Sequence, residues 1–297
     1  MATSFYHLHL CTSEDHPDIF ICDSDFRTAV NLLALCLSLF PGIDLYCYEF
    51  MSNHLHLLLS GPEGVIDSFF KFYIRKLSGC FAADGKVKNL SKLSYKCHKI
   101  DSLDHLLNVI VYIHRNASVV DGSESPYTYR WGTGRYYFNP EASARYNVAK
   151  QKVTLAQRQL FSHSRKFDKV EGLFEVDNCI SPMCFCKIAE GERLFAGAGR
   201  YLFMLAKNVE SSKSISKEIG ERITYNDYEL YPVLVKAAGR LFGSNDVSTL
   251  SANQKLELAR ILHYDYNSSN KQICRMLKLG IPVVNELFPQ SAIKIAR

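Results

Sequence analysis

The stretch that decides the fold reads Met51-Ser52-Asn53-His54-Leu55-His56-Leu57-Leu58-Leu59. It has the apolar residues of a short buried strand, interrupted by two histidines one residue apart. Side chains at i and i+2 of a strand leave the same face, so His54 and His56 are expected to point to one place while Leu55 enters the core. Imidazoles are common metal ligands, so the pattern indicates a metal site on a sheet. Half-exposed or hydrogen-bonded histidines are the alternative.

The elements around this strand predict a split βαβ arrangement. Pro41-Gly42 is expected to end the first helix, and Asp23-Ser24-Asp25 offers residues that can cap its start. The order strand, helix, strand, strand, helix, strand, helix is that of a ferredoxin-like antiparallel sheet with one added helix. The expected strands are residues 4–10, 43–50, 93–100 and a strand from residue 54, and the expected helices are residues 26–40, 65–81 and 103–116.

The last of these helices carries the chemistry. Tyr112 and Asn116 are four residues apart and therefore share one helix face. If that face covers His54 and His56, a phenol and a carboxamide meet two imidazoles. A metal held there would polarise a phosphodiester, and the tyrosine hydroxyl would attack it to form a covalent intermediate. Taken singly, Tyr112 reads as a core aromatic and Asn116 as a helix cap, and both alternatives remain open from the residues alone.

Three short motifs follow one another between residues 6 and 137. They are the strand at 51–59, the helix segment Tyr112-Ile113-His114-Arg115-Asn116-Ala117-Ser118 and the segment Tyr129-Arg130-Trp131-Gly132-Thr133-Gly134-Arg135-Tyr136. In this order they resemble the single-tyrosine HUH transposase family, and most of all its branch of REP-associated tyrosine transposases. Three motifs at matching spacing are far more specific than any one of them.

The resemblance implies a ferredoxin-like nuclease, usually dimeric, that cuts single-stranded DNA at or near a hairpin. In the family, two histidines and a polar residue one turn after the tyrosine bind Mg²⁺ or Mn²⁺. Those positions are His54, His56 and Asn116 here. The family's tyrosine, which is Tyr112 here, becomes joined to the 5′-phosphate and a 3′-hydroxyl is released.

The chain also departs from the family pattern. Ser52 replaces the usual proline before Asn53, and we expect this to alter only the turn. Ala117 replaces the proline after the polar ligand, so the helix is expected to run on. The histidines of the segment 7–9 fall where the family has no metal ligands, and we interpret them as structural. His114 is two residues from the tyrosine and faces elsewhere, so we do not assign it to the metal.

Basic side chains outside the motifs are the expected phosphate contacts. Residues 145–169 are strongly basic, although a solvated connecting helix would have the same composition. Residues 179–208 and 214–241 are expected to be helical, and residues 251–288 resemble a helix-turn-helix, with a helical packing module as the alternative. The residues assigned to DNA contact are Lys71, Arg75, Arg115, Arg130, Arg135, Lys150, Lys152, Arg158, Lys271, Arg275 and Lys278.

The length and composition of the chain limit the classes of protein to which it can belong. A chain of 297 residues is expected to hold two domains. The net charge of +5 permits a nucleic-acid partner without requiring one. No apolar run approaches the roughly 18–20 residues needed to cross a bilayer, and no secretory signal is visible, so no membrane partner is expected. Ten scattered cysteines fit free thiols in a reducing cytoplasm, and a DNA substrate would associate the protein with the nucleoid.

The sequence therefore predicts an α+β protein. Its parts are an HUH nuclease domain at residues 1–140, a basic connecting segment at 141–175 and a helical domain at 176–297, with a candidate helix-turn-helix at 251–288. The expected function is metal-dependent cleavage and rejoining of single-stranded DNA at hairpins through a 5′-phosphotyrosine. A homodimer is expected, with a monomer as the alternative. A DNA-binding regulator without turnover and a replication or plasmid-mobilisation nuclease are the competing readings, and the chain could serve a mobile element or its host.

Overall fold

The structure is a computed structural model that describes residues 4–11, 18–86, 90, 93, 95–120, 125–207, 227–266 and 268–289. The chain forms two compact units, Met1–Asn208 and Val209–Arg297. The boundary between the units differs from the predicted ones at residues 140 and 175. The stretch expected to connect two domains lies within the first unit.

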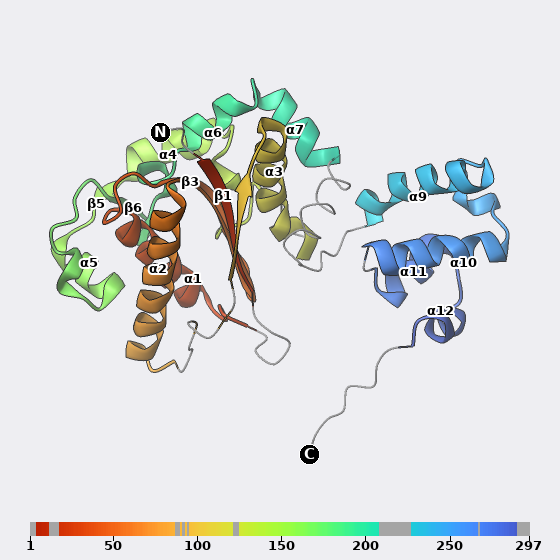
Figure 1. The fold of residues 1–297 in the computed structure, drawn as a ribbon, viewed down its shortest axis with the longest axis horizontal. Helices are drawn as coiled ribbons and strands as arrows, with labels where there is room; N and C mark the ends of the chain where they lie inside the picture. Colours follow the sequence, from red (N-terminus) through yellow and green to blue (C-terminus); the bar gives the residue numbers. More distant parts are fainter. Residues whose placement is uncertain are drawn as a thin grey trace, which may run out of the picture. The chain divides into compact units, whose positions relative to one another are not determined.

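A four-stranded antiparallel sheet forms the centre of the first unit, and its strands lie in the order β2-β3-β1-β4 (Figure 1). The two inner strands, β1 and β3, pair along their whole length, so the strand that carries His54 and His56 lies within the sheet. The α+β class expected from the sequence is confirmed. The strands are β1 (Ser4–Cys11), β2 (Asp44–Phe50), β3 (His54–Gly61) and β4 (Tyr95–Ile100).

Helices cover both faces of this sheet. Figure 1 shows α1 (Asp23–Leu37) and α2 (Glu63–Ala83) on one side and α3 (Leu103–Val120) on the other. The α1 and α2 side receives Leu8 and Leu10 of β1 and Leu55, Leu57 and Leu59 of β3, which are fully buried. As Ala117 suggested, α3 continues past residue 116. Asp23 and Asp25, which were expected to cap α1, lie instead inside its first turn. Their negative charges interact favourably there with the positive end of the helix dipole.

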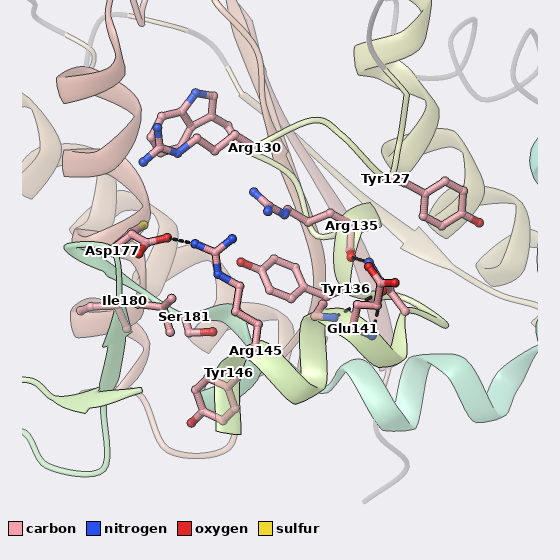
Figure 2. Close-up of a pocket in the computed structure, with 15 residues that line it drawn as sticks. Tyr127, Arg130, Arg135, Tyr136, Glu141, Arg145, Tyr146, Asp177, Ile180 and Ser181 are labelled. Atoms are coloured by element: carbon pink, nitrogen blue, oxygen red, sulfur yellow. Dashed lines mark hydrogen bonds and ion pairs between the residues drawn. The ribbon is translucent and has the colours of Figure 1, made fainter. Parts of the chain in front are cut away.

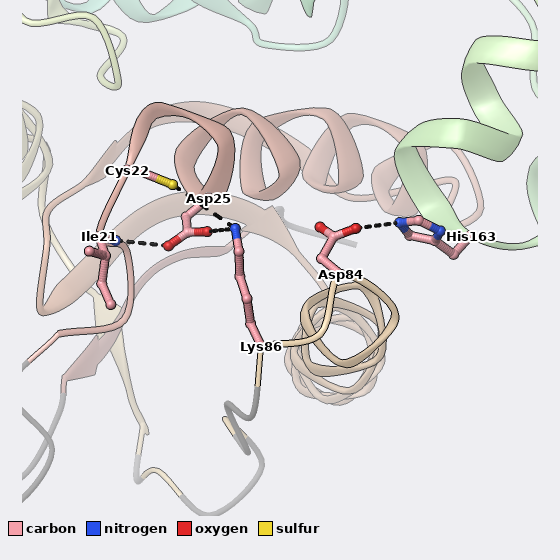
Figure 3. A network of polar contacts seen from close by, with 6 residues as sticks. All are labelled: Ile21, Cys22, Asp25, Asp84, Lys86 and His163. Atoms are coloured by element: carbon pink, nitrogen blue, oxygen red, sulfur yellow. Dashed lines mark hydrogen bonds and ion pairs between the residues drawn. The ribbon is translucent and has the colours of Figure 1, made fainter.

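A buried carboxylate ties the start of α1 to the end of α2. Asp25 accepts a hydrogen bond from the Ile21 backbone N–H at 2.8 Å and forms an ion pair with Lys86 (Figure 3). The Asp25 carboxylate raises the pKa of Lys86. Beside this pair, His163 Nε2 donates to Asp84 Oδ1 at 3.1 Å. These contacts join segments from three parts of the chain on the apolar side of the sheet.

The described residues that follow α3 in the first unit form further helices and strands. A small sheet of order β5-β6-β7, which the sequence did not predict, accompanies the helices that follow α3. Cys179 and Ile180 belong to its last strand, although a helix was expected there. The elements are α4 (Pro140–Ala149), β5 (Gln151–Lys152), α5 (Leu155–Ser162), β6 (Phe174–Val176), β7 (Cys179–Ile180), α6 (Ile188–Leu194) and α7 (Ala198–Lys207), with 3-10 turns at Gly134–Tyr136, Arg165–Phe167 and Pro182–Cys184.

The described part of the second unit is helical. The start of the helix expected at residues 214–241 lies outside the described residues. The helix expected from residue 251 ends in a π-helical turn at Ile261–Asp265. Across the described residues of the whole chain, no helix is both long and apolar enough to span a bilayer. The elements are α9 (Asp227–Phe242), a 3-10 turn at Val247–Thr249, α10 (Ala252–Arg260), α11 (Asn270–Leu277) and α12 (Ile281–Leu287).

Candidate active site

Four histidines from the two inner strands meet on one face of the sheet. His9 lies directly opposite His56 in the antiparallel register, and the alternation of each strand puts His7 and His54 on the same face. The His9 and His56 rings stack at a centroid distance of 4.6 Å, and the His54 ring lies 5.0 Å from that of His56. All four side chains are buried. We call His7, His9, His54 and His56 the histidine cluster.

Both predicted ligand histidines are held through the same ring nitrogen. His54 Nδ1 lies 2.7 Å from Asn53 Oδ1, and because a carbonyl oxygen only accepts, the nitrogen must donate. His56 Nδ1 lies 3.0 Å from His7 Nε2. A ring held through Nδ1 presents Nε2 to a ligand, and metal-binding histidines are commonly oriented in this way. Nε2 of both rings is buried.

Helix α3 brings Tyr112 onto this face of the sheet. The ring centroid of Tyr112 lies 5.4 Å from that of His56 and 6.0 Å from that of His7, both edge to face. Asn116 follows one helical turn later and is buried. Within the described part of the chain, its Nδ2 has no hydrogen-bond partner. A buried amide in this state can turn its oxygen toward a cation, which gives the residue a role that helix capping does not.

The donor set fits a divalent ion with two nitrogens and one oxygen. His54 and His56 present Nε2, and Asn116 supplies an amide oxygen after rotation about its last bond. No three His, Cys, Asp or Glu side chains among the described residues come together in a way that would hold a metal ion. The amide is therefore essential to the predicted set, because the histidine pair alone provides only two ligands.

The candidate nucleophile is closed off from solvent. Tyr112 is 1% exposed and His56 is 0% exposed. A phosphodiester is bulky and charged, so it can reach the Tyr112 hydroxyl only if the structure above the cluster opens. This burial is a property that the sequence pattern did not predict.

A carboxylate that the sequence reasoning missed adjoins the cluster. Glu49 of β2 lies opposite His56 in the sheet register and is buried. Gly132 packs against it, since a Cβ at that position would lie 2.8 Å from Glu49 Oε2. A charged residue that follows the apolar residues 45–48 of this strand was the available signal. Carboxylate oxygens suit hard cations, so Glu49 places an oxygen-bearing side chain beside the predicted ligands.

The third motif lines the edge of the sheet beside the cluster. The Phe50 N–H donates to the Trp131 carbonyl and the Thr133 N–H donates to the Tyr48 carbonyl, each at 3.0 Å. Gly132 lies between these two bonds and bridges to Glu49. The segment that resembles the family's third motif is thus attached to β2, the strand next to the one that carries the histidines.

His114 takes no part in the cluster. Its Nδ1 lies 2.9 Å from the Tyr201 hydroxyl and its Nε2 lies 3.1 Å from Thr133 Oγ1. Burial lowers the pKa of His114 to about 3, so the ring is neutral at ordinary pH. The residue joins α3 to α7 and to the third motif.

The predicted DNA contacts on the first unit fall into different settings. Lys71 and Arg75 are exposed on α2, which covers the opposite face of the sheet from Tyr112. Arg115 is 3% exposed, so in this conformation its side chain does not reach the surface, and its assignment to DNA contact stays a prediction. Arg158 donates to the carbonyls of Val153 and Asp168, both at 2.9 Å, and so has a structural role.

Further predicted contacts lie on accessible surface. Arg130 and Arg135 line a cleft beside the third motif. Lys150 lies over the Tyr146 ring at 4.9 Å, and Lys152 is exposed on the following strand.

In the second unit, one predicted contact is already engaged. Arg275 binds the Asp227 carboxylate, with one contact at 2.7 Å, which lowers the pKa of that carboxyl. This ion pair joins α11 to α9, and it uses the charge that was assigned to DNA. Lys271 and Lys278 remain exposed.

The candidate site thus comprises the histidine cluster and Tyr112 on one sheet face, with Glu49 opposite His56 and Asn116 one helical turn beyond Tyr112. These side chains are of the types that could hold a small cation beside a phenol. Comparisons of the chain with protein-family models, with curated proteins and with solved structures find no match.

Proposed function

We propose that the protein is a metal-dependent single-stranded DNA endonuclease and strand transferase of the single-tyrosine HUH type. Tyr112 is the nucleophile, and His54, His56 and Asn116 hold the metal. The observation that carries this proposal is the position of the Tyr112 ring against His56 on the sheet face that bears both ligand histidines. Residues more than fifty positions apart in the chain meet there, as a shared catalytic role requires.

The arrangement of the sheet supports the finer fold assignment. The strand order β2-β3-β1-β4, with helices between β1 and β2 and between β3 and β4, is that of a ferredoxin-like sheet. The third helix then covers the face that such a sheet leaves open, and it carries Tyr112. We therefore propose that the first unit is an HUH nuclease domain with its catalytic helix in the usual place.

The residues of the site suit Mn²⁺ or Mg²⁺. Mn²⁺ accepts imidazole nitrogen together with amide oxygen, whereas Mg²⁺ prefers oxygen, so two histidines favour manganese. The bound ion would polarise the scissile phosphate. His7 and Asn53 hold the two ligand rings in position through Nδ1.

In the cleavage step, the Tyr112 oxygen attacks the phosphorus and the bond from phosphorus to the 3′-oxygen breaks. The phenol loses its proton and the departing 3′-oxygen gains one, so charge and atoms balance. The product is a 5′-phosphotyrosine with a free 3′-hydroxyl. Attack by a 3′-hydroxyl reverses these bonds and rejoins DNA. Two protomers, each with one tyrosine, would handle two DNA ends, and we propose a homodimer that acts on hairpin-bearing strands at the nucleoid.

A second candidate function is a DNA-binding regulator that keeps the nuclease fold without turnover. The observation that favours it is the burial of Tyr112 and His56, which shields both reactive groups from a substrate. In the enzyme, DNA binding must expose the tyrosine, whereas in a regulator it never does.

The test is incubation with a pool of labelled single-stranded hairpin oligonucleotides and Mn²⁺, followed by a denaturing gel. The enzyme predicts a protein-linked band that Tyr112→Phe abolishes while hairpin binding persists. Tyr6→Phe is the matched control, because it removes the same hydroxyl from β1 on the opposite face of the sheet. Hairpin binding without a band in the wild type would favour the regulator, and absence of both binding and band would overturn the proposal.

A further inference from the structure

A cleft of about 300 Å³ opens beside the third motif in the first unit. Its walls come from residues 127–146 and 176–181. Figure 2 shows the side chains of Arg130, Arg135 and Arg145 around a common space, with the Tyr136 ring between Arg135 and Arg145. Guanidinium groups that converge on one space form a ready binding site for a phosphate, because their planar N–H groups match its oxygens.

The charges in the cleft leave one arginine unbalanced. Arg145 forms an ion pair with Asp177, and Arg130 pairs with Asp23 of α1 at 3.0 Å. Arg135 makes no ion pair within the described part of the chain, and its guanidinium lies 5.6 Å from the centre of the Tyr136 ring. The lining holds three arginines against two carboxylates, Glu141 and Asp177. With Asp23 included, three carboxylates face the three arginines, so the charge that a phosphodiester would meet is the local one of Arg135, the lining arginine without an ion pair among the described residues.

Flat side chains line the same cleft. Arg130 lies over the Trp131 ring at 4.8 Å, and Tyr136 and Tyr146 stand on either side of Arg145 (Figure 2). Aromatic rings and guanidinium planes are the surfaces on which unpaired bases stack, and such stacking tolerates any base. A site that held only inorganic phosphate would not need these rings.

The cleft is linked to the candidate active site by a short path. Trp131 lines the cleft, and the next residue, Gly132, packs against Glu49, which lies opposite His56. Gly132 pairs with Glu49, and Glu49 pairs with His56. Because neighbouring strands lie about 5 Å apart, the backbones of Gly132 and His56 are about 10 Å apart. A DNA strand held in the cleft would therefore pass close to Tyr112.

We propose that this cleft binds one phosphodiester and the adjoining unpaired base of a DNA strand, next to the phosphate that Tyr112 attacks. The location beside the scissile phosphate rests on the proposed function, whereas the binding itself does not. Arg135 contacts the phosphate, and Tyr146 stacks on the base. The cleft thus holds the strand independently of the metal and the tyrosine.

The experiment measures binding without cleavage. A fluorescently labelled oligothymidine of about ten nucleotides, within the range of single-strand site sizes, is titrated with full-length Tyr112→Phe protein without metal, and anisotropy is read. Arg135→Ala is expected to weaken binding roughly tenfold and to reduce the slope of log affinity against log salt by about one. Tyr146→Ala is expected to weaken binding with the slope unchanged. Arg193→Ala, which removes an exposed arginine outside the cleft, is the matched control.

The outcomes separate this proposal from the catalytic one. If Arg135→Ala binds as tightly as Arg193→Ala, the cleft proposal is overturned even where the wild type forms the tyrosine adduct. If Arg135→Ala and Tyr146→Ala both lose affinity, the cleft proposal stands even where no adduct forms. Loss of affinity in Arg135→Ala alone would overturn base stacking, and tighter binding of an oligouridine RNA would overturn the choice of DNA.

Discussion

The two faces of the central sheet are built from the same strands with opposite chemistry. On one face, Leu55 and Leu57 of β3 pack under α1 and α2, and on the other, His54 and His56 lie under α3. Burying a leucine stabilises the fold by about 1.5–3 kcal/mol. Burying an imidazole has a cost that hydrogen bonds must offset. We expect one face to maintain the fold and the other to carry the proposed chemistry, and the following experiments test that division.

The largest expected effect is the loss of a ligand from the polar face. His56→Ala should reduce formation of the tyrosine adduct by at least about 100-fold, since even outer partners of metal ligands contribute 10–100-fold. The measurement is the rate of adduct formation on a hairpin oligonucleotide at fixed Mn²⁺. An unchanged rate of adduct formation would mean that His56 takes no part in the reaction, and it would contradict the proposal that the histidine face carries the chemistry.

The next residue of the same strand should show the opposite behaviour. Leu57→Ala is expected to lower the free energy of unfolding by about 2–5 kcal/mol, because it leaves a cavity in a fully buried site. Adduct formation per folded molecule should stay near the wild-type rate. Urea unfolding provides the measurement, and Leu160→Ala, at an exposed position, is the control. Equal losses in the two variants would mean that the leucine face does not maintain the fold.

A smaller effect is expected from the partner of a ligand. His7→Phe removes the hydrogen bond to His56 Nδ1 while it keeps an aromatic ring of similar size. The affinity for Mn²⁺ should fall by about 10–100-fold, with the rate at saturating metal retained. His7→Gln, whose amide can renew the hydrogen bond, should recover most of the affinity. A loss of rate at saturating metal with unchanged affinity would show that His7 does not position a ligand.

The smallest expected effect is a loss of folding stability at acidic pH. His114 is buried as a neutral ring with its pKa lowered from 6.5 to about 3, so the unfolded chain binds a proton there more readily than the folded one. Its contribution to stability is complete above pH 6.5 and is lost as pH falls toward 3. At pH 5 the loss is about 2 kcal/mol. Urea unfolding at pH 7 and pH 5 should show a smaller acid loss for His114→Gln, and equal losses would contradict this account.

Local sequence patterns predicted the strands of the sheet and the helices that cover it, because the spacing of apolar residues that indicates each element lies within a few neighbouring residues. The segment at 7–9 shows where that reasoning stopped. Its histidines were interpreted as structural, yet the pairing of β1 with β3 puts them on the same face as His54 and His56. The expected ferredoxin-like order already implied that these two strands pair. Since alternate residues of a strand share a face, the spacing of the histidines in the two segments could have revealed the cluster.

Other features depend on contacts that no local pattern contains. Arg158 and Arg275 look like free charges in the sequence, but their partners come from other segments of the chain. Arg115 is basic yet buried, since α3 is covered on more than one side. The strands β5, β6 and β7 have two or three residues each, too few for periodicity to identify.

The close packing of Gly132 on Glu49 also bears on how the protein behaves at high concentration. Without the segment of the third motif, the edge strand β2 would expose unpaired backbone N–H and C=O groups that could pair with a strand of another molecule. Exposed edge strands of that kind promote aggregation. The third motif occupies these groups from within the same molecule, and the absence of a side chain at Gly132 leaves room for the Glu49 carboxylate. The third motif therefore blocks pairing of β2 with a strand of another molecule at Tyr48 and Phe50.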